Sequence, residues 1–184
     1  MDKCIIVGMY VPDLFSEFQS TLKEKGELWV MNDWYQFYPW IDEPDRIWNI
    51  HPAPHIHPDE SRFTGDWKAE YNKTDAVVMI AHEMAGIHNT KMIDKAALLT
   101  YPVEYLGCSI SIMILQALIE GYEEINIIGC QLSNKEYINQ ALGIKLATAE
   151  ASTHGAKVNF LPQDFIIANW SELEIATIPY WDKT

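Results

Sequence analysis

Residues 108–129 read CSISIMILQALIEGYEEINIIG, and this stretch decides the fold class. Apolar residues occupy both sides of a helical pattern from Ile110 to Ile119, as in a buried helix, and Gly121 stops the pattern. The run from Ile125 to Ile128 is apolar except for Asn126 and does not alternate strictly between apolar and polar residues, which is typical of a strand covered on both faces. A buried helix that leads into such a strand predicts an α/β domain with a parallel sheet.

Strand and helix patterns alternate in both directions from this stretch. One helical pattern begins at a cap residue, Asp13, and ends at Gly26. Another begins at Ser133 and ends near Gly155. Six short apolar runs of strand type accompany them: Cys4–Val7, Leu28–Met31, Arg46–Ile50, Ala76–Ile80, Ile125–Ile128 and Val158–Leu161. We therefore predict a single Rossmann-like domain over residues 1–184, a three-layer sandwich with a mostly parallel sheet and helices on both faces.

Two segments depart from this alternation. Residues 34–75 are rich in prolines and aromatics, and a long insertion of this kind often serves as a functional loop or lid. Its aromatics either stack on a base or pack the loop on its own sheet: Trp34, Tyr35, Phe37, Tyr38 and Trp40. Residues 164–184 are too apolar for a frayed tail, so we expect them to dock on the domain or on a second subunit as a homo-oligomer.

Charge and cysteine usage narrow the classes of partner and compartment. The 13 basic and 26 acidic residues give a formal net charge of -13, which repels nucleic-acid phosphate and anionic lipid. We therefore expect neither a nucleic acid nor a membrane as partner. The three cysteines lie far apart and the start of the chain lacks the pattern of a signal peptide, so we expect a cytoplasmic location.

Residues that directly follow the predicted strands are candidates for a binding site, since open parallel sheets bind ligands at the carboxyl ends of their strands. These candidates, with one aromatic neighbour, are Gly8, Met9, Asn32, Asp33, Tyr35, His51, His82, Glu83, Gly129 and Gln131. The pair His82 and Glu83 suits a catalytic base with its orienting group, and a hydrogen-bond network within a loop is the alternative.

Cysteine and histidine offer two further kinds of chemistry. Cys108 at a helix start is either a nucleophile of lowered pKa or a buried structural residue, and we favour the structural role. His51, His55 and His57 stand in a proline-rich stretch, where the last two could face one side of an extended chain toward zinc. Their spacing matches no strong zinc motif, so we favour solvated histidines in a stiff loop and predict no metal.

Five segments resemble a family of uncharacterised bacteriophage proteins in order and spacing. They are WVMNDWY at 29–35, RIWNIHP at 46–52, YPVE at 101–104, CSISIM at 108–113 and GYEEINIIG at 121–129. That family looks distantly related to the bacterial sialyltransferases and to a Rossmann-like group that includes an archaeal pterin pyrophosphokinase. The resemblance implies a location in the cytoplasm of the host cell.

In the sialyltransferases the equivalent segments surround a cytidine nucleotide. The resemblance thus implies that Gly8, Asn32 and Ser109 contact a nucleotide or a nucleotide-sugar, with no other cofactor. A helix start near Ser109 and Ser111 suits a phosphate, because its free N–H groups and hydroxyls can donate to it. The amide of Asn32 suits a base or ribose edge.

Three functional hypotheses follow. The first is a glycosyltransferase-like transferase, with His51 or His82 near the reacting centre. The second is a non-catalytic protein that sequesters a nucleotide of host defence signalling; Met9, Ile110 and Gln131, which depart from the sialyltransferase pattern, favour it. The third is an accessory factor that binds a protein partner through its aromatic loop and its C-terminal tail.

Overall fold

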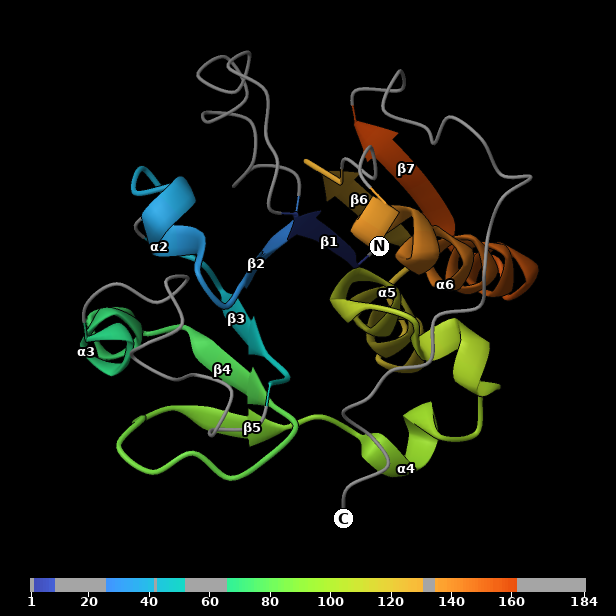
Figure 1. The fold of residues 1–184 in the computed structure, drawn as a ribbon. Coiled ribbons are helices and arrows are strands. Elements are labelled where there is room, and N and C mark those ends of the chain that lie inside the picture. Colours follow the sequence, from blue (N-terminus) through green and yellow to red (C-terminus); the bar gives the residue numbers. More distant parts are fainter. Residues whose placement is uncertain (1, 9–25, 42, 52–65, 131–134, 162–184) are drawn as a thin grey trace.

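The computed structural model describes residues 2–8, 26–41, 43–51, 66–130 and 135–161. These residues form one sheet of parallel strands in the order β5-β4-β3-β2-β1-β6-β7 (Figure 1). The strands are β1 (Lys3–Val7), β2 (Glu27–Met31), β3 (Arg46–Asn49), β4 (Val77–Ile80), β5 (Thr90–Met92), β6 (Glu124–Ile128) and β7 (Lys157–Leu161). The predicted Rossmann-like α/β fold class is confirmed.

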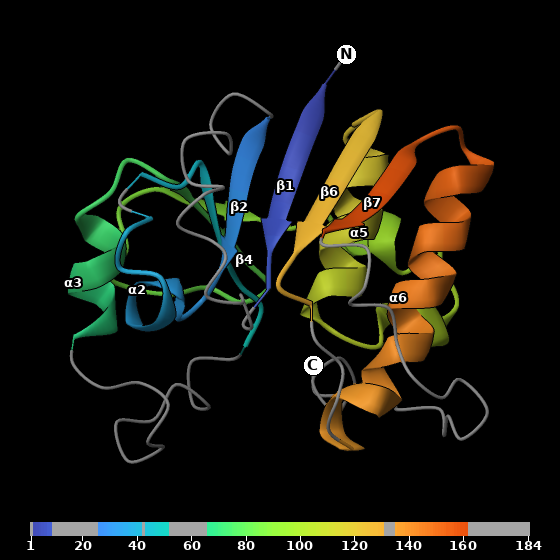
Figure 2. The same cartoon turned by 90° about the horizontal axis from the view of Figure 1, so that it is seen from above.

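Helices cover both faces of the sheet. They are α2 (Trp34–Phe37), α3 (Trp67–Asn72), α4 (Lys95–Leu98), the 3₁₀ helix η3 (Val103–Leu106), α5 (Ser109–Ile119) and α6 (Lys135–Thr153). Figure 2 shows α2 and α3 on the opposite side of the molecule from α5 and α6. None of the described helices is long and apolar enough to cross a membrane.

Alternate residues of the central strands enter two separate apolar cores. Cys4 and Ile6 of β1 belong to the core under α5 and α6, whereas Ile5 and Val7 belong to the core under α2 and α3. Because successive side chains of a strand point to opposite faces, a strand covered on both faces needs apolar residues at every position. This requirement explains the continuous apolar runs in the sequence.

All six strands expected from the sequence are present, with bounds shifted by one residue at most. The sequence did not predict β5, because its three side chains are exposed and form no apolar run. The helical pattern between Asp13 and Gly26 and the tail at 164–184 fall outside the described residues, as does residue 1. The docking of that tail and its role in a homo-oligomer therefore stay predictions.

An ion-pair cluster ties the end of α5 to the neighbouring strands. The guanidinium of Arg46 lies 4.5 Å from the ring centroid of Trp29 and pairs with the carboxylate of Glu27. A second carboxylate, that of Glu120 after α5, lies 2.7 Å from Arg46 Nη1. The hydroxyl of Tyr122 donates to Glu27 and accepts from Arg46. The cluster joins β2 and β3 to the turn between α5 and β6, at the edge where the strands begin.

Candidate functional site

The candidate site lies where the strand order reverses. From β1 the chain moves through β2, β3, β4 and β5 on one side, and β6 and β7 lie on the other. Ligands of open α/β sheets bind at such a reversal, at the carboxyl ends of the strands. Here the backbone N–H of Gly8 donates to the carbonyl of Ile128 over 2.7 Å. The structure thus brings the ends of β1 and β6 into direct contact.

Gly8 and Gly129 are required by this contact. A Cβ at Gly8 would lie 2.5 Å from the carbonyl oxygen of Gly129, so no side chain fits there. Gly129 itself has a φ of 70°, in the left-handed region that favours glycine. The ends of β1 and β6 therefore meet backbone to backbone, with no side chain between them. Met9 and Gln131, which were expected beside these glycines, lie outside the described residues.

The first turn of α5 points toward the same edge, because the helix leads through Gly121 into the amino end of β6. Cys108 caps this helix: its sulfur accepts from the N–H of Ser111 over 3.5 Å. The hydroxyl of Ser111 accepts from the Cys108 N–H over 3.1 Å and donates to the Cys108 carbonyl over 2.8 Å. Ser111 is fully buried, whereas Ser109 is partly exposed at the start of the helix.

The two predicted serines thus occupy different positions. The hydroxyl of Ser111 is hydrogen-bonded to the backbone of Cys108. The hydroxyl of Ser109 forms no hydrogen bond with another described residue. Burial raises the pKa of the Cys108 thiol, and it raises that of Cys130 after β6 as well. Both are therefore protonated at neutral pH, as the structural role favoured for Cys108 requires.

The turns after β2 and β3 are linked by a buried polar chain. Asn32 and Asp33 after β2 are both buried. The hydroxyl of Tyr71, from α3, donates to the carbonyl of Asn32 over 2.6 Å. It also accepts from Asn49 Nδ2 at 3.1 Å, and Asn49 Oδ1 accepts from the backbone N–H of His51 at 3.3 Å. One hydroxyl therefore connects the ends of two neighbouring strands.

Sequence reasoning missed Tyr71 and Asn49. The one signal available was Asn49 itself, a polar residue that directly follows the apolar Ile47 and Trp48 in the predicted strand, where a buried amide needs a hydrogen-bond partner. Nothing in the sequence paired it with Tyr71, which is 22 residues away and on another element.

His82 and Glu83 follow β4 and lie one strand further out than His51. His82 is partly exposed and Glu83 is exposed. Burial lowers the pKa of His82, and the positive charge of Lys95 lowers it further. At neutral pH the ring is therefore uncharged and able to accept a proton. In the described part of the chain no hydrogen bond or ion pair joins His82 to Glu83.

The aromatic segment after β2 packs mainly on its own sheet. Trp34 and Tyr38 are buried in the core under α2 and α3, and Trp34 Nε1 donates to the carbonyl of Ile41 over 2.9 Å. Tyr35 is half-buried, with its ring edge-on to Trp34 at 5.4 Å between centroids. Of the two roles considered for these aromatics, packing is the one that Trp34 and Tyr38 have.

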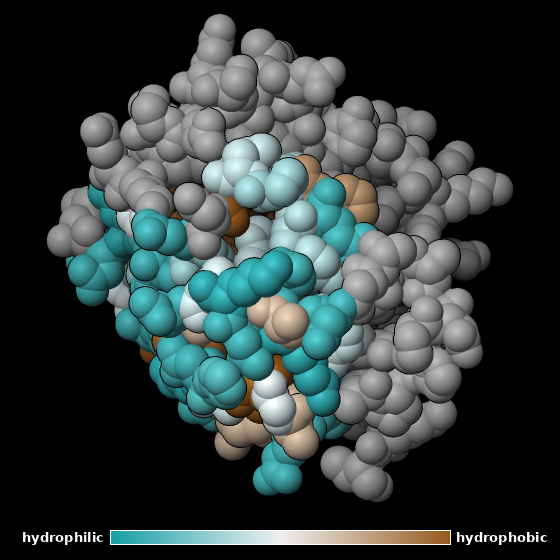
Figure 3. All heavy atoms as spheres, turned by 90° about the vertical axis from the view of Figure 1, so that its left-hand side faces the viewer, coloured by the Kyte–Doolittle hydropathy of each residue, from teal (hydrophilic) through white to brown (hydrophobic). Residues whose placement is uncertain are grey.

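Few large apolar side chains reach the surface. Among the described residues they are Phe37, Met92, Leu99 and Val103. The side of the molecule that carries α3 and β5 is largely hydrophilic where it is coloured (Figure 3). Of these, Phe37 belongs to the aromatic segment of the hypothesised protein-binding surface, and the C-terminal tail lies outside the described residues.

The described residues contain no group of three histidine, cysteine or acidic side chains able to hold a metal ion. His55 and His57 lie outside the described residues. Of the three histidines in the proline-rich stretch, the structure therefore describes His51 alone.

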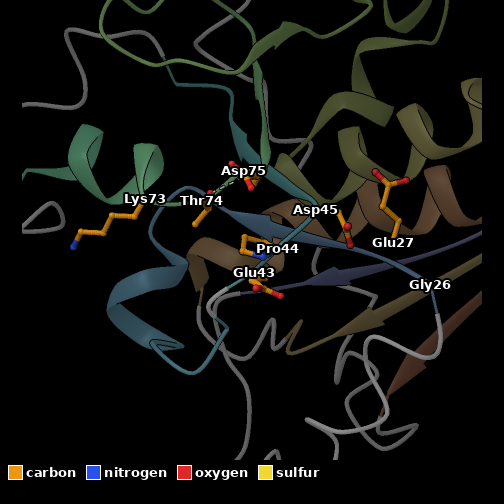
Figure 4. Close-up of a pocket in the computed structure, with 9 residues that line it drawn as sticks. Gly26, Glu27, Glu43, Pro44, Asp45, Lys73, Thr74 and Asp75 are labelled. Atoms are coloured by element: carbon orange, nitrogen blue, oxygen red, sulfur yellow. Dashed lines mark hydrogen bonds between the residues drawn. The ribbon is translucent and has the colours of Figure 1, made fainter.

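A hollow of about 670 Å³ lies at the opposite edge, where β2, β3 and β4 begin (Figure 4). Its acidic side chains include Glu27, which pairs with Arg46, and Asp45, whose carboxylate accepts from the Leu28 N–H over 2.6 Å. Lys73 extends away from them and pairs with Glu70 at 2.6 Å. The carboxylates of Glu27 and Asp45 are therefore already bonded within the protein, where the strands begin. We assign the candidate site to the edge where the strands end instead.

Comparisons with known proteins agree with the fold. No protein family and no curated protein matches the sequence. Among solved structures, the fold is similar to that of the sialyltransferase CstII from Campylobacter jejuni, solved in complex with the substrate analogue cytidine-5'-monophosphate. The TM-score is 0.55 at 15% sequence identity, over 94% of this chain and 85% of the other. The distant similarity to sialyltransferases that the sequence implied is therefore confirmed at the level of the fold.

Proposed function

We propose that the protein binds a nucleotide or nucleotide-sugar at the carboxyl edge of its sheet and acts as a glycosyltransferase-like transferase. The observation that carries this proposal is the reversal of strand order between β1 and β6, with polar residues at the ends of β2 and β3 beside it. The similarity in fold to a sialyltransferase that was solved with a cytidine nucleotide supports the same ligand class.

The described residues offer a complementary group for each part of such a ligand. The partly exposed hydroxyl of Ser109 at the start of α5 suits a phosphate, since a helix start favours negative charge. The amide of Asn32 suits a base or ribose edge. Gly8 and Gly129 let the ends of β1 and β6 meet closely beside this proposed site.

The reacting centre would lie toward His51 or His82. His82 is the stronger candidate for a base, because its lowered pKa leaves the ring uncharged at neutral pH. Asp33 and Tyr35, which follow β2, and Glu83, which follows β4, complete the proposed surroundings. The resemblance to bacteriophage proteins supports a role inside a host cell.

Calorimetric titration with cytidine-5'-monophosphate and with cytidine and uridine nucleotide-sugars tests the proposal. We expect Ser109→Ala to weaken nucleotide binding about 5- to 150-fold, since a lost hydrogen bond to a charged group costs about 1 to 3 kcal/mol. Ser152→Ala removes a hydroxyl from the exposed end of α6 and should leave the affinity unchanged.

The fate of the ligand separates the functional hypotheses. A nucleotide-sugar that is converted after incubation supports a transferase, and one that is recovered intact supports sequestration. If no nucleotide or nucleotide-sugar binds, the proposal is wrong and the search should turn to protein partners.

A further inference from the structure

Tyr71 lies in the core next to the candidate site and is not part of its surface. Its side chain is 1% exposed, in the core under α2 and α3. The ring lies 5.6 Å from Trp34 and 5.3 Å from Trp67, measured between centroids. Aromatic packing on two sides fixes the ring, and with it the position of the hydroxyl.

The hydroxyl bonds to both turns that lead away from the sheet. It donates to the carbonyl of Asn32 after β2 and accepts from the amide of Asn49 at the end of β3. The other side of the Asn49 amide accepts from the backbone N–H of His51. Asn49 is completely buried, so these bonds are shielded from water and loss of one leaves a polar group unsatisfied.

This arrangement uses the backbone of Asn32 and not its side-chain amide. The Asn32 carbonyl accepts a hydrogen bond from the Tyr71 hydroxyl, and this bond orients the peptide between Asn32 and Asp33. The side-chain amide of Asn32 forms no hydrogen bond with any other residue in the described ranges. A short polar side chain on a fixed peptide is preorganised for a ligand, whereas the same side chain on a loose turn must be ordered first.

We infer that Tyr71 is a positioning residue for the proposed nucleotide site: its hydroxyl holds the Asn32 peptide and, through Asn49, the His51 backbone in the arrangement that a bound nucleotide meets. The inference rests on the proposed function. Tyr71 acts through these groups and does not touch the ligand. Burial raises the pKa of Tyr71 well above its ordinary value, so the hydroxyl remains a donor throughout the neutral range.

Tyr71→Phe tests the inference, because it keeps the packed ring and removes only the hydroxyl. We expect binding of cytidine-5'-monophosphate to weaken about tenfold to a hundredfold, which is the order of loss that a displaced site residue causes. Tyr122→Phe is the matched control. It removes a hydrogen-bonded hydroxyl from a half-buried tyrosine at the opposite edge of the sheet, where that hydroxyl bonds Glu27 and Arg46.

The comparison of the two variants separates positioning from general stability. Both should unfold more easily than the wild type, and only Tyr71→Phe should lose affinity when titrated well below its melting temperature. A double-mutant cycle with Asn32→Ala adds a second readout: if Tyr71 acts through Asn32, the two losses of binding free energy should not add. Additive losses, or an unchanged affinity in Tyr71→Phe, would overturn the inference.

Two further outcomes are informative. If wild-type protein binds no nucleotide, the proposed function fails and the inference about Tyr71 falls with it. If Tyr71→Phe does not fold, Asn49→Ser is titrated in its place, since it removes the amide that links Tyr71 to His51. An unchanged affinity in Asn49→Ser would then overturn the part of the inference that runs through Asn49 to His51.

Discussion

At the scale of single residues, the start of α5 shows how two similar side chains can have different roles. Ser109 and Ser111 are both near the phosphate position that the resemblance implies. Only Ser111 forms the reciprocal cap with Cys108, and it is fully buried, whereas Ser109 is partly exposed. We therefore expect stability to depend on Ser111 and ligand affinity to depend on Ser109.

Ser111→Ala should lower the free energy of unfolding by about 1 to 2 kcal/mol, since it removes a helix cap and leaves a backbone N–H without its acceptor. Ser109→Ala should change it by less than about 0.5 kcal/mol, as is usual for exposed positions. Urea unfolding of both variants measures the difference. Equal stability of the two variants would contradict the assignment of the cap.

His82 should make the stability depend on pH. Its pKa is lower in the folded protein than the ordinary value of about 6.5, so protonation favours the unfolded chain. Its contribution to stability is complete above about pH 6.5 and is lost as the pH falls through the folded pKa.

Replacement of His82 checks this dependence. His82→Gln should lose less of its melting temperature between pH 7.5 and pH 5.0 than the wild type does. Thermal melts of both proteins across this range give the comparison, and parallel curves would show that His82 is not responsible.

At the scale of elements, the ion-pair cluster around Arg46 joins one helix end to two strands. Arg46→Met should lower the free energy of unfolding by about 2 to 3 kcal/mol, because it leaves Glu27 and Glu120 half-buried and facing each other. Lys73→Met breaks an exposed pair with Glu70 and should cost less than about 0.5 kcal/mol. Chemical unfolding of the two variants checks the contrast, and equal losses would argue against a structural role for the cluster.

The elements also show what could be predicted from the sequence. Buried strands and the buried helix α5 leave continuous apolar patterns, so their positions follow from residue type alone. The exposed strand β5 leaves no such pattern. The contacts of the candidate site were not predictable either, since Tyr71 reaches Asn32 across 39 residues and that pairing depends on the packing of α3.

At the scale of the whole molecule, the two cores share the same strands, so neither can persist without the other. We expect a single unfolding transition, in which the tryptophan fluorescence, from Trp29 and Trp48 in one core and Trp34 in the other, changes together with the far-ultraviolet circular dichroism. Two separate transitions would show that the two sides of the sheet unfold independently.

Ligand binding should stabilise this unit as a whole. Cytidine-5'-monophosphate at about 100 times its dissociation constant should add about 2.7 kcal/mol to the free energy of unfolding. For a domain of this size that corresponds to a rise in melting temperature of roughly 5 to 11 °C. A thermal-shift titration measures it, and an unchanged melting temperature at saturating nucleotide would contradict specific binding to the folded state.

The edge strand β5 has a consequence for the protein at high concentration. An outermost strand exposes backbone groups that can pair with another chain and so begin aggregation. β5 is only three residues long, and Lys91 at its middle is exposed and charged. A growing stack of chains would have to bring these ammonium groups together along a very short template. The strand that leaves no apolar pattern in the sequence thereby protects this edge of the sheet from pairing with another chain.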